Sequence, residues 1–225
     1  MKLINQFLFT MFFISTGALA NVSASIGVNS NYLFNGVSQT ANNPALQIGI
    51  NWEGNGAYFS LWGSNVDFGD DTNIEADLLA GYILKLNEDI NFDFGIAQYS
   101  YHGHSQSKNF NYAEAWSKFN YKNTSIRFWF SWDYFGTEAN HSIWMVNHDI
   151  PLTDNFMISL SIDRSNSHDK NKWVWQKNDA SYVHGKIQAS YQTPFAEFFM
   201  SIHHLDLVND KSDRLVVGIN KSFNF

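Results

Sequence analysis

Hydrophobic and polar residues alternate along most of this chain. The clearest run places four apolar residues on one face, Ile126, Phe128, Phe130 and Trp132. Period-2 alternation is typical of a β-strand with two unlike faces. About a dozen such runs follow one another, each roughly the length that a tilted membrane strand needs. The pattern predicts an all-β fold: a transmembrane antiparallel up-and-down β-barrel of about 12 strands. The segments Tyr112–Tyr121 and Ile143–Ile150 are the least regular, so the exact strand number stays open there.

The connections between the runs are alternately short and long. Gly54-Asn55-Gly56 is a compact turn, whereas the polar stretches 35–43 and 165–179 are longer. This asymmetry is typical of outer-membrane barrels, in which an even strand number places both barrel termini at the short-turn end. The first run extends from Val22 to Phe34, and no plug-like segment precedes it.

Charge and aromatic residues indicate which face points outward. Lys221 is the exception to an apolar face that is nearly free of charge, and it lies near a strand end, where a lysine can reach water. Aromatic residues gather at the strand ends, as in the interfacial girdles of membrane barrels. Those near the short turns are Trp52, Tyr82, Tyr121, Tyr191 and Phe225. Those near the long loops are Tyr32, Phe34, Trp132 and Tyr134. The apolar face is therefore predicted to meet lipid and the polar face to line a lumen.

The N-terminus predicts export. Lys2, an apolar stretch and the small residues of Ala18-Leu19-Ala20 are typical of a secretory signal peptide over residues 1–20, which leaves 21–225 as the barrel. The net charge of -7 and the absence of a basic block exclude nucleic acid as a partner. We expect a Gram-negative outer-membrane protein, exported through the periplasm. Its partners would be outer-membrane lipids and the barrel-assembly machinery, which would recognise the terminal Phe225. Its oligomeric state stays open.

The predicted lumen carries charges of both signs. Its ionisable residues are Glu53, Glu75, Asp77, Asp93, Glu114, Lys118, Arg127, Asp133, His184, Lys186 and Glu197. Such a lining predicts a porin-like channel for passive diffusion of small polar solutes, with acidic excess favouring cations. In the alternative reading these groups pair and fill the barrel together with the inward aromatics Tyr58, Trp62, Tyr99, Tyr101 and Trp129.

Other chemistry finds weaker support in the sequence. The histidines gather toward the long loops, where clustered imidazoles could bind a transition metal: His102, His104, His141, His168, His203 and His204. His104-Ser105 and His141-Ser142 offer side chains for a lipid-cleaving enzyme, without a nucleophile motif. Trp173 and Trp175 could stack a sugar or simply extend a hairpin. We therefore assign no catalytic residue, metal or cofactor. A barrel enzyme and a structural or adhesion barrel are the rival functions.

Several motifs resemble a known family. The segment from Ser30 to Thr40 (SNYLFNGVSQT), followed by Pro44-Ala45-Leu46-Gln47, is similar to the N-terminal signature of the TorF-family porins of proteobacteria. Further similar pieces lie between residues 62 and 103, and the motif-bearing stretch spans about residues 25–115. Asn35 stands where that family often has Arg, which weakens any charge role for this loop, and His102 stands where it has Pro. The resemblance implies an outer-membrane barrel with a presumed transport role.

Overall fold

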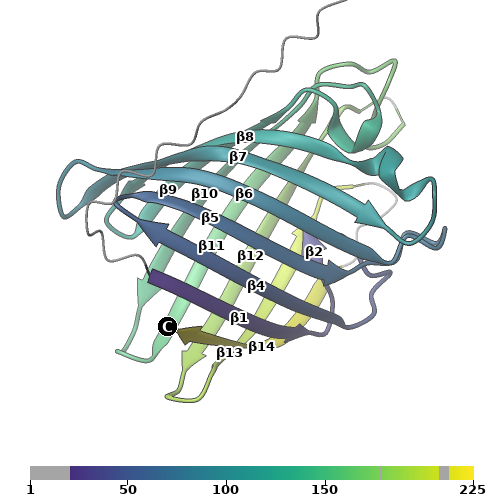
Figure 1. Ribbon diagram of the computed structural model, residues 1–225. Helices are drawn as coiled ribbons and strands as arrows, with labels where there is room; N and C mark the ends of the chain where they lie inside the picture. The colour runs from purple at the N-terminus through teal and green to yellow at the C-terminus, as the bar shows by residue number, and fades with distance from the viewer. Residues whose placement is uncertain (1–20, 178, 208–212) are drawn as a thin grey trace, which may run out of the picture.

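The computed structural model describes residues 21–177, 179–207 and 213–225; the predicted signal peptide lies outside this range. Within it, twelve strands close into an antiparallel barrel (Figure 1). These are β1 (Asn21–Asn29), β4 (Ala45–Gly54), β5 (Ala57–Asn65), β6 (Ile74–Lys85), β7 (Ile90–His102), β8 (Tyr112–Tyr121), β9 (Thr124–Ser131), β10 (His141–Pro151), β11 (Phe156–Ser167), β12 (Ser181–Gln192), β13 (Glu197–Leu205) and β14 (Arg214–Asn224). The strand β1 pairs with both β4 and β14, which closes the barrel and leaves no free edge. The predicted fold class is confirmed.

The two faces of the barrel follow the alternation of the sequence. Ile50, Leu61 and Leu78 are register partners on neighbouring strands and share the outer face. Apolar side chains that lie exposed on this face include Val28, Leu46, Ile48, Phe59, Phe94, Ile96, Ile126, Val146, Ile162, Ile187, Met200, Ile202 and Leu215. An exposed apolar band around a closed barrel is the surface that a transmembrane barrel presents to lipid. The predicted outward orientation of the apolar face is confirmed.

The two ends of the barrel differ in their connections. The short-turn end carries residues 55–56, 86–89, 122–123, 152–155 and 193–196. The long-loop end carries the described residues of the other connections, 30–44, 66–73, 103–111, 132–140, 168–177, 179–180, 206–207 and 213. Asn55 (φ 53°) and Gly56 (φ 83°) form the turn predicted between β4 and β5, which requires left-handed backbone. The amide of Phe225 donates to the carbonyl of Val22 at 2.9 Å, so the last strand ends beside the first. The described helices, η1 (Ser107–Phe110) and η2 (Tyr134–Gly136), are too short to cross a membrane.

The first long loop departs from the predicted strand. Strand β1 ends at Asn29 instead of continuing to Phe34, and residues 30–44 turn into the barrel. They contain a two-stranded hairpin, β2 (Leu33–Phe34) and β3 (Val37–Ser38), whose turn is Asn35-Gly36 with φ of 46° and 84°. Asn-Gly is the dipeptide that such a two-residue turn favours. We call residues 30–44 the inward hairpin.

The predicted aromatic girdles are confirmed only in part. Trp52, Tyr82, Tyr121, Tyr191 and Phe225 lie exposed near the short-turn end, and Trp132 is 60% exposed at the long-loop end. Tyr32, Phe34 and Tyr134, however, belong to an aromatic cluster inside the barrel. The prediction failed for these three because they lie in loops that fold inward, where the period-2 rule of a strand no longer sets the direction of a side chain.

Candidate functional site

The inward hairpin folds into the lumen, and its tip contacts the wall formed by β12–β14, of which β14 is the sheet neighbour of β1. The Tyr182 hydroxyl of β12 donates to the Asn35 carbonyl at 3.0 Å, and Arg214 Nη1 of β14 donates to the Gly36 carbonyl at 2.8 Å. Gly36 lies so close to the wall that a Cβ there would fall 2.6 Å from His184 Cδ2 and 2.9 Å from the Leu205 side chain. The tip of the hairpin therefore requires glycine for both its backbone conformation and its contact.

Two aromatic residues of the hairpin pack on the wall that continues from β4 through β5 to β7, on the other side of β1. The Tyr32 ring lies 5.4 Å from Trp62 on β5, and the Phe34 ring lies 6.3 Å from Tyr99 on β7, both edge to face. Such geometries are favoured between aromatic rings. With both walls in contact, the inward hairpin narrows the lumen at the long-loop end.

Short polar residues hold the base of the hairpin. Asn31 is buried, and its Oδ1 accepts from the hydroxyls of Ser38 at 2.7 Å and Thr40 at 3.1 Å. The Thr40 hydroxyl is also within 2.6 Å of the Asn43 carbonyl. These local bonds give the loop backbone an alternative to a strand ladder, which explains why the chain leaves β1 here. The motif that resembles TorF-family porins thus forms the lumen constriction.

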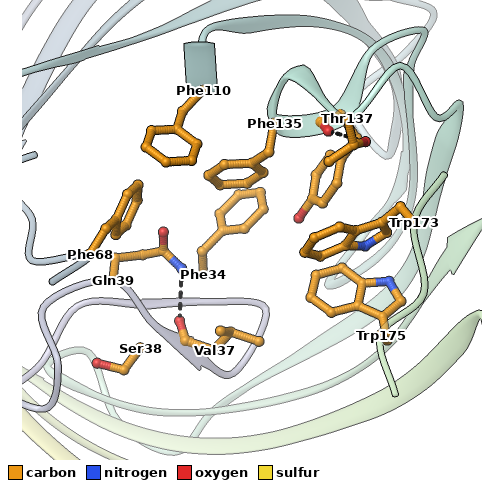
Figure 2. A pocket seen from close by; sticks show the side chains of 11 residues that line it. Phe34, Val37, Ser38, Gln39, Phe68, Phe110, Phe135, Thr137, Trp173 and Trp175 are labelled. Carbon is orange, nitrogen blue, oxygen red and sulfur yellow. Dashed lines mark hydrogen bonds between the residues drawn. The ribbon is translucent and has the colours of Figure 1, made fainter. Parts of the chain in front are cut away.

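A cavity of about 350 Å³ lies beside the inward hairpin, at the long-loop end of the barrel (Figure 2). Its lining is mainly aromatic: Phe34, Val37, Ser38, Gln39, Phe68, Phe110, Tyr134, Phe135, Thr137, Trp173 and Trp175. We call it the vestibule. Trp173 and Trp175 come from the longest loop and lie together on one side of the cavity, with ring centroids 5.6 Å apart. The sequence left their role open, and the structure places both at the entrance to the lumen.

A second cavity of about 240 Å³ lies along the wall formed by β1, β4 and β12–β14. Tyr32 and Leu33 of the inward hairpin border it, and Lys186, Gln188, Ser201 and His203 supply most of its polar surface. Lys186 and Gln188 lie near the middle of β12, so this cavity extends from the hairpin toward the short-turn end. The hairpin thus separates an aromatic space from a polar one.

Three predicted lumen carboxylates are buried beside the hairpin. Tyr101 donates to Glu75 at 2.9 Å and Tyr99 donates to Glu114 at 3.0 Å. Asp77 follows Glu75 by two residues on β6 and shares its face. Each carboxylate has one buried oxygen without a partner among the described residues. All three are over nine-tenths buried. They belong to the filled part of the barrel more than to a water-exposed path.

The predicted lumen cations have a different environment. Lys118 and Arg127 are register partners on β8 and β9, and both are half-buried, as is Lys186 on β12. The ion pairs of the described residues include none of these three. Arg127 instead lies over the Trp129 ring at 4.8 Å. Like charges on directly opposed residues destabilise a sheet, so the pair of Lys118 and Arg127 is unfavourable unless an anion or water binds between the two groups.

Carboxylates of the same region are engaged by neutral donors. Asp93 accepts from the Tyr58 hydroxyl at 2.7 Å and from the Trp116 ring nitrogen at 3.4 Å. Asp149 accepts from the Ser159 hydroxyl at 2.6 Å and from Asn147 at 3.0 Å. The lumen cations are therefore left available to solutes, although acidic groups lie nearby.

The remaining predicted residues have diverse positions. Glu53 and Glu197 face inward at the short-turn end. Asp133 does not line the lumen: β9 ends at Ser131, and Asp133 lies exposed in the next loop, where it accepts from the Glu138 amide at 2.7 Å. His184 is buried in the wall and contacts Asp163.

Inward ionisable residues that sequence reasoning did not assign to the lumen include Asp149, Asp163, His203 and Arg214. Asp163 Oδ2 lies 2.6 Å from His184 Nδ1, and His184 Nε2 lies 3.0 Å from His203 Nδ1. The signal was available, because continuing the alternation of Phe156–Ile162 by one residue places Asp163 on the inner face. The same count from Leu215 places Arg214 on the inner face, but no local signal indicates its contact with Gly36, which lies 178 residues earlier in the chain.

The histidines do not assemble into a metal site. Among the described residues, no group of three or more His, Cys, Asp or Glu side chains is arranged to hold a metal ion. His141 accepts from the Trp175 ring nitrogen at 3.2 Å and stacks on Tyr134 at 3.9 Å. His204 pairs with Asp213 at 2.6 Å.

The adjacent Ser-His pairs of the sequence do not bond to each other. Ser142 instead contacts His168 Nε2 at 2.8 Å and not the adjacent residue His141. Asn166, the register partner of Ser142, lies 3.5 Å from His168 Nδ1. Ser142 and Asn166 are on the outer face, beside the exposed Trp144.

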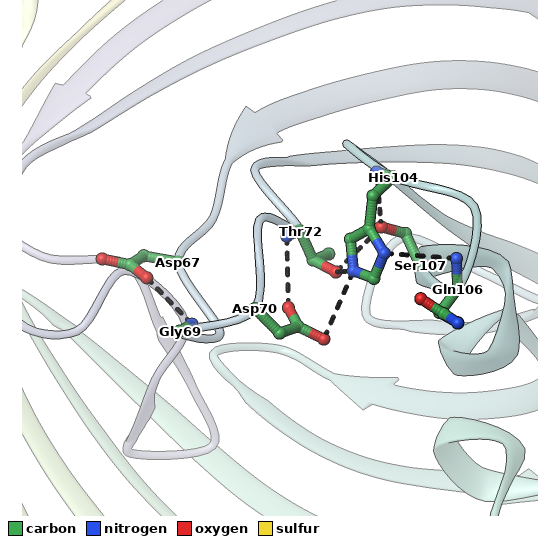
Figure 3. Close-up of polar contacts among 7 residues, drawn as sticks. All are labelled: Asp67, Gly69, Asp70, Thr72, His104, Gln106 and Ser107. Carbon is green, nitrogen blue, oxygen red and sulfur yellow. Dashed lines mark hydrogen bonds and ion pairs between the residues drawn. The ribbon is translucent and has the colours of Figure 1, made fainter.

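Two loops at the rim are tied together (Figure 3). The hydroxyls of Thr72 and Ser107 are 2.9 Å apart, and His104 Nε2 lies 3.6 Å from Asp70 Oδ2. Hydrogen bonds from Thr72, and to a smaller extent from His104, hold the pKa of the Asp70 carboxyl below its ordinary value. These contacts fix the wall of the vestibule that Phe68 and Phe110 supply.

Solved porin structures share this fold. The NanC porin is 13% identical, with a TM-score of 0.57, over 90% of this chain and 98% of that chain. A KdgM porin is 12% identical, with a TM-score of 0.57, over 90% and 99% of the two chains. A KdgM porin in complex with disordered oligogalacturonate is 10% identical, with a TM-score of 0.58, over the same shares. At these identities the similarity is one of fold, that of a porin-like β-barrel.

The chain belongs to the family described as "Bacterial protein of unknown function (Gcw_chp)", which matches residues 15–161. The match covers more than half of the chain and includes the inward hairpin and the barrel through the first half of β11. No curated protein sequence matches the chain significantly.

Proposed function

We propose that this protein is an outer-membrane channel for passive diffusion of small polar solutes. A lipid-facing apolar band, a closed barrel and a polar inner face support this function. The observation that carries it is the pair of cavities on the two sides of the inward hairpin, because they give a solute space along the lumen on both sides of the constriction. The resemblance to TorF-family porins agrees with this proposal.

The proposal includes location and orientation. Residues 1–20 would direct export through the periplasm, and Phe225 would be recognised by the barrel-assembly machinery. The long-loop end would then face outward and the short-turn end would face the periplasm. Solutes would enter through the vestibule, pass the inward hairpin and meet Lys118, Arg127 and Lys186, with Glu53 and Glu197 at the periplasmic mouth. Cation preference, which the acidic excess of the sequence predicts, stays a prediction for the lumen as a whole.

Planar-bilayer conductance of the refolded full chain tests this function. We expect discrete single-channel steps and flux of small solutes into liposomes. Refolded protein that inserts, resists proteolysis and yet gives neither steps nor flux would contradict the proposal.

A second candidate function, hydrolysis of lipid esters, is favoured by the Ser142–His168 contact at 2.8 Å with Asn166 beside the imidazole. Serine, histidine and a polar group that orients the histidine are the components of an acyl-transfer site, and here they lie on the outer face. Release of fatty acid from phospholipid vesicles would test it. Activity that disappears in Ser142→Ala but persists in Ser105→Ala would support hydrolysis; equal release by all variants would contradict it.

A further inference from the structure

The vestibule differs from the rest of the lumen in what lines it. Six of its residues are Phe or Trp: Phe34, Phe68, Phe110, Phe135, Trp173 and Trp175. They come from the inward hairpin and from four other long loops, so rings surround the cavity on several sides (Figure 2). Its volume of about 350 Å³ is within the range of small-molecule sites. A space of this kind favours a molecule with a flat apolar face.

The polar side chains of the vestibule mostly bond to the protein itself. Ser38 donates to Asn31 at 2.7 Å, Gln39 donates to the Val37 carbonyl at 3.2 Å, and Thr137 donates to the Tyr134 carbonyl at 2.6 Å. The Trp175 ring nitrogen is engaged by His141. A sugar would bury several hydroxyls here without partners, which is costly, so the lining disfavours a sugar.

Two polar groups of the lining are exceptions: the Trp173 ring nitrogen, which is fully covered and has no partner among the described residues, and the Tyr134 hydroxyl. Tyr134 is 1% exposed and lines the cavity, and its hydroxyl forms no hydrogen bond within the described residues. The hydroxyl oxygen is not fully covered by other atoms, and it accounts for the small surface that Tyr134 exposes. Burial raises the pKa of Tyr134 well above the ordinary value, so the group stays a donor at neutral pH.

We propose that the vestibule is a binding site for monocyclic aromatic solutes that carry a hydrogen-bond acceptor. The rings of Phe110, Phe135 and Trp173 would contact the solute ring, and the Tyr134 hydroxyl would donate to its acceptor. The biological role of this site rests on the proposed channel function, because the site would determine which class of solute enters the channel. The binding itself does not require transport.

Calorimetric titration of the purified full chain in detergent tests the site, with benzamide as the aromatic probe and glucose as the polar probe. We expect saturable benzamide binding above that of detergent alone, and no saturable glucose binding at the same concentrations. Phe110→Ala should weaken benzamide binding about tenfold because it removes a ring contact. Tyr134→Phe keeps the ring and should weaken it about fivefold.

Trp132→Ala is the matched control, since Trp132 is an aromatic residue of the same rim that points outward. Benzamide should bind this variant as it binds the wild type. Wild-type affinity in both Phe110→Ala and Tyr134→Phe, no saturable benzamide binding, or competition by glucose would overturn the proposal. If benzamide affinity changes in the variants as expected but the protein gives no single-channel conductance steps, the channel function is contradicted and the vestibule binding site is supported.

Discussion

The two halves of the lumen differ in how their polar groups are satisfied. At the long-loop end, Glu75 and Glu114 are buried, and tyrosines donate to them across the aromatic cluster. Toward the short-turn end, Lys118, Arg127 and Lys186 are half-buried and form no ion pair within the described residues. One half is therefore built as a protein core, and the other as a surface that faces solute.

This difference distinguishes charged residues that stabilise the fold from charged residues that affect ion permeation, which the net charge of the lumen does not distinguish. Buried, hydrogen-bonded carboxylates hold the wall against which the inward hairpin packs, and changing them should affect stability first. Unpaired cations change the potential of the lumen at little structural cost, and changing them should affect ion permeation first. The comparison can be broken by variants that act on one half alone.

The largest effect is expected from Gly36→Val. Its side chain would meet His184 and Leu205, so the tip of the hairpin must leave the wall, and we expect a several-fold rise in single-channel conductance. Gly69→Val is the control, because Gly69 also has positive φ (78°) but has open space around it. Both variants bear a backbone strain of about 1–2 kcal/mol. Equal conductance in the two variants would show that the hairpin does not constrict the lumen.

Arg214→Lys should have the next largest effect. Lysine keeps the charge but cannot reproduce the contacts of the guanidinium with the Gly36 carbonyl and Asn42 Oδ1. We expect more frequent transitions between conductance levels in bilayer recordings. Arg164→Lys changes an arginine of the outer face that bonds to Ser181 and should leave the recordings unchanged. Identical traces for both variants would remove Arg214 from the account of the constriction.

A moderate effect should distinguish the two halves by charge. Arg127→Ala should shift the cation-to-anion permeability ratio about twofold toward cations, as removal of one charge several ångströms from the ion path in water implies. Glu114→Gln should change the ratio less, because Glu114 is buried and accepts from Tyr99. Reversal potentials in a salt gradient measure both. A larger shift in Glu114→Gln than in Arg127→Ala would invert the assignment of roles.

The smallest effect concerns pH and the loops at the rim. Because the pKa of Asp70 is lowered in the folded protein, its contribution is complete above the ordinary pKa of 3.8 and is lost as the pH falls through the lower, folded value. We expect faster hydrogen exchange in residues 66–73 and 103–111 at acid pH, after correction for intrinsic rates. Asp70→Asn should remove this pH dependence, whereas Asp71→Asn should retain it. A response confined to Asp71→Asn would contradict the assignment.

Much of the barrel could be predicted because a strand has a fixed period. Counting by two gives the outward positions of Ile126 and Phe128 and the inward position of Arg127. The same count predicted the strand Tyr112–Tyr121, although the apolar pattern of that segment is weak. Asp163 could have been placed by the same count. Asp133 was misplaced because the count was extended two residues beyond the end of β9.

The sequence alone determined the barrel, its approximate strand number, the lipid-facing side and the asymmetry of its ends, since these depend on period-2 alternation and local turn residues. Only the tertiary structure decided that residues 30–44 fold inward, that Tyr134 and Phe34 line a vestibule, and which lumen charges are buried. The direction of a loop depends on contacts such as Arg214 with Gly36, which join residues far apart in the chain. No local pattern encodes such a contact, and the constriction of this lumen consists of contacts of that kind.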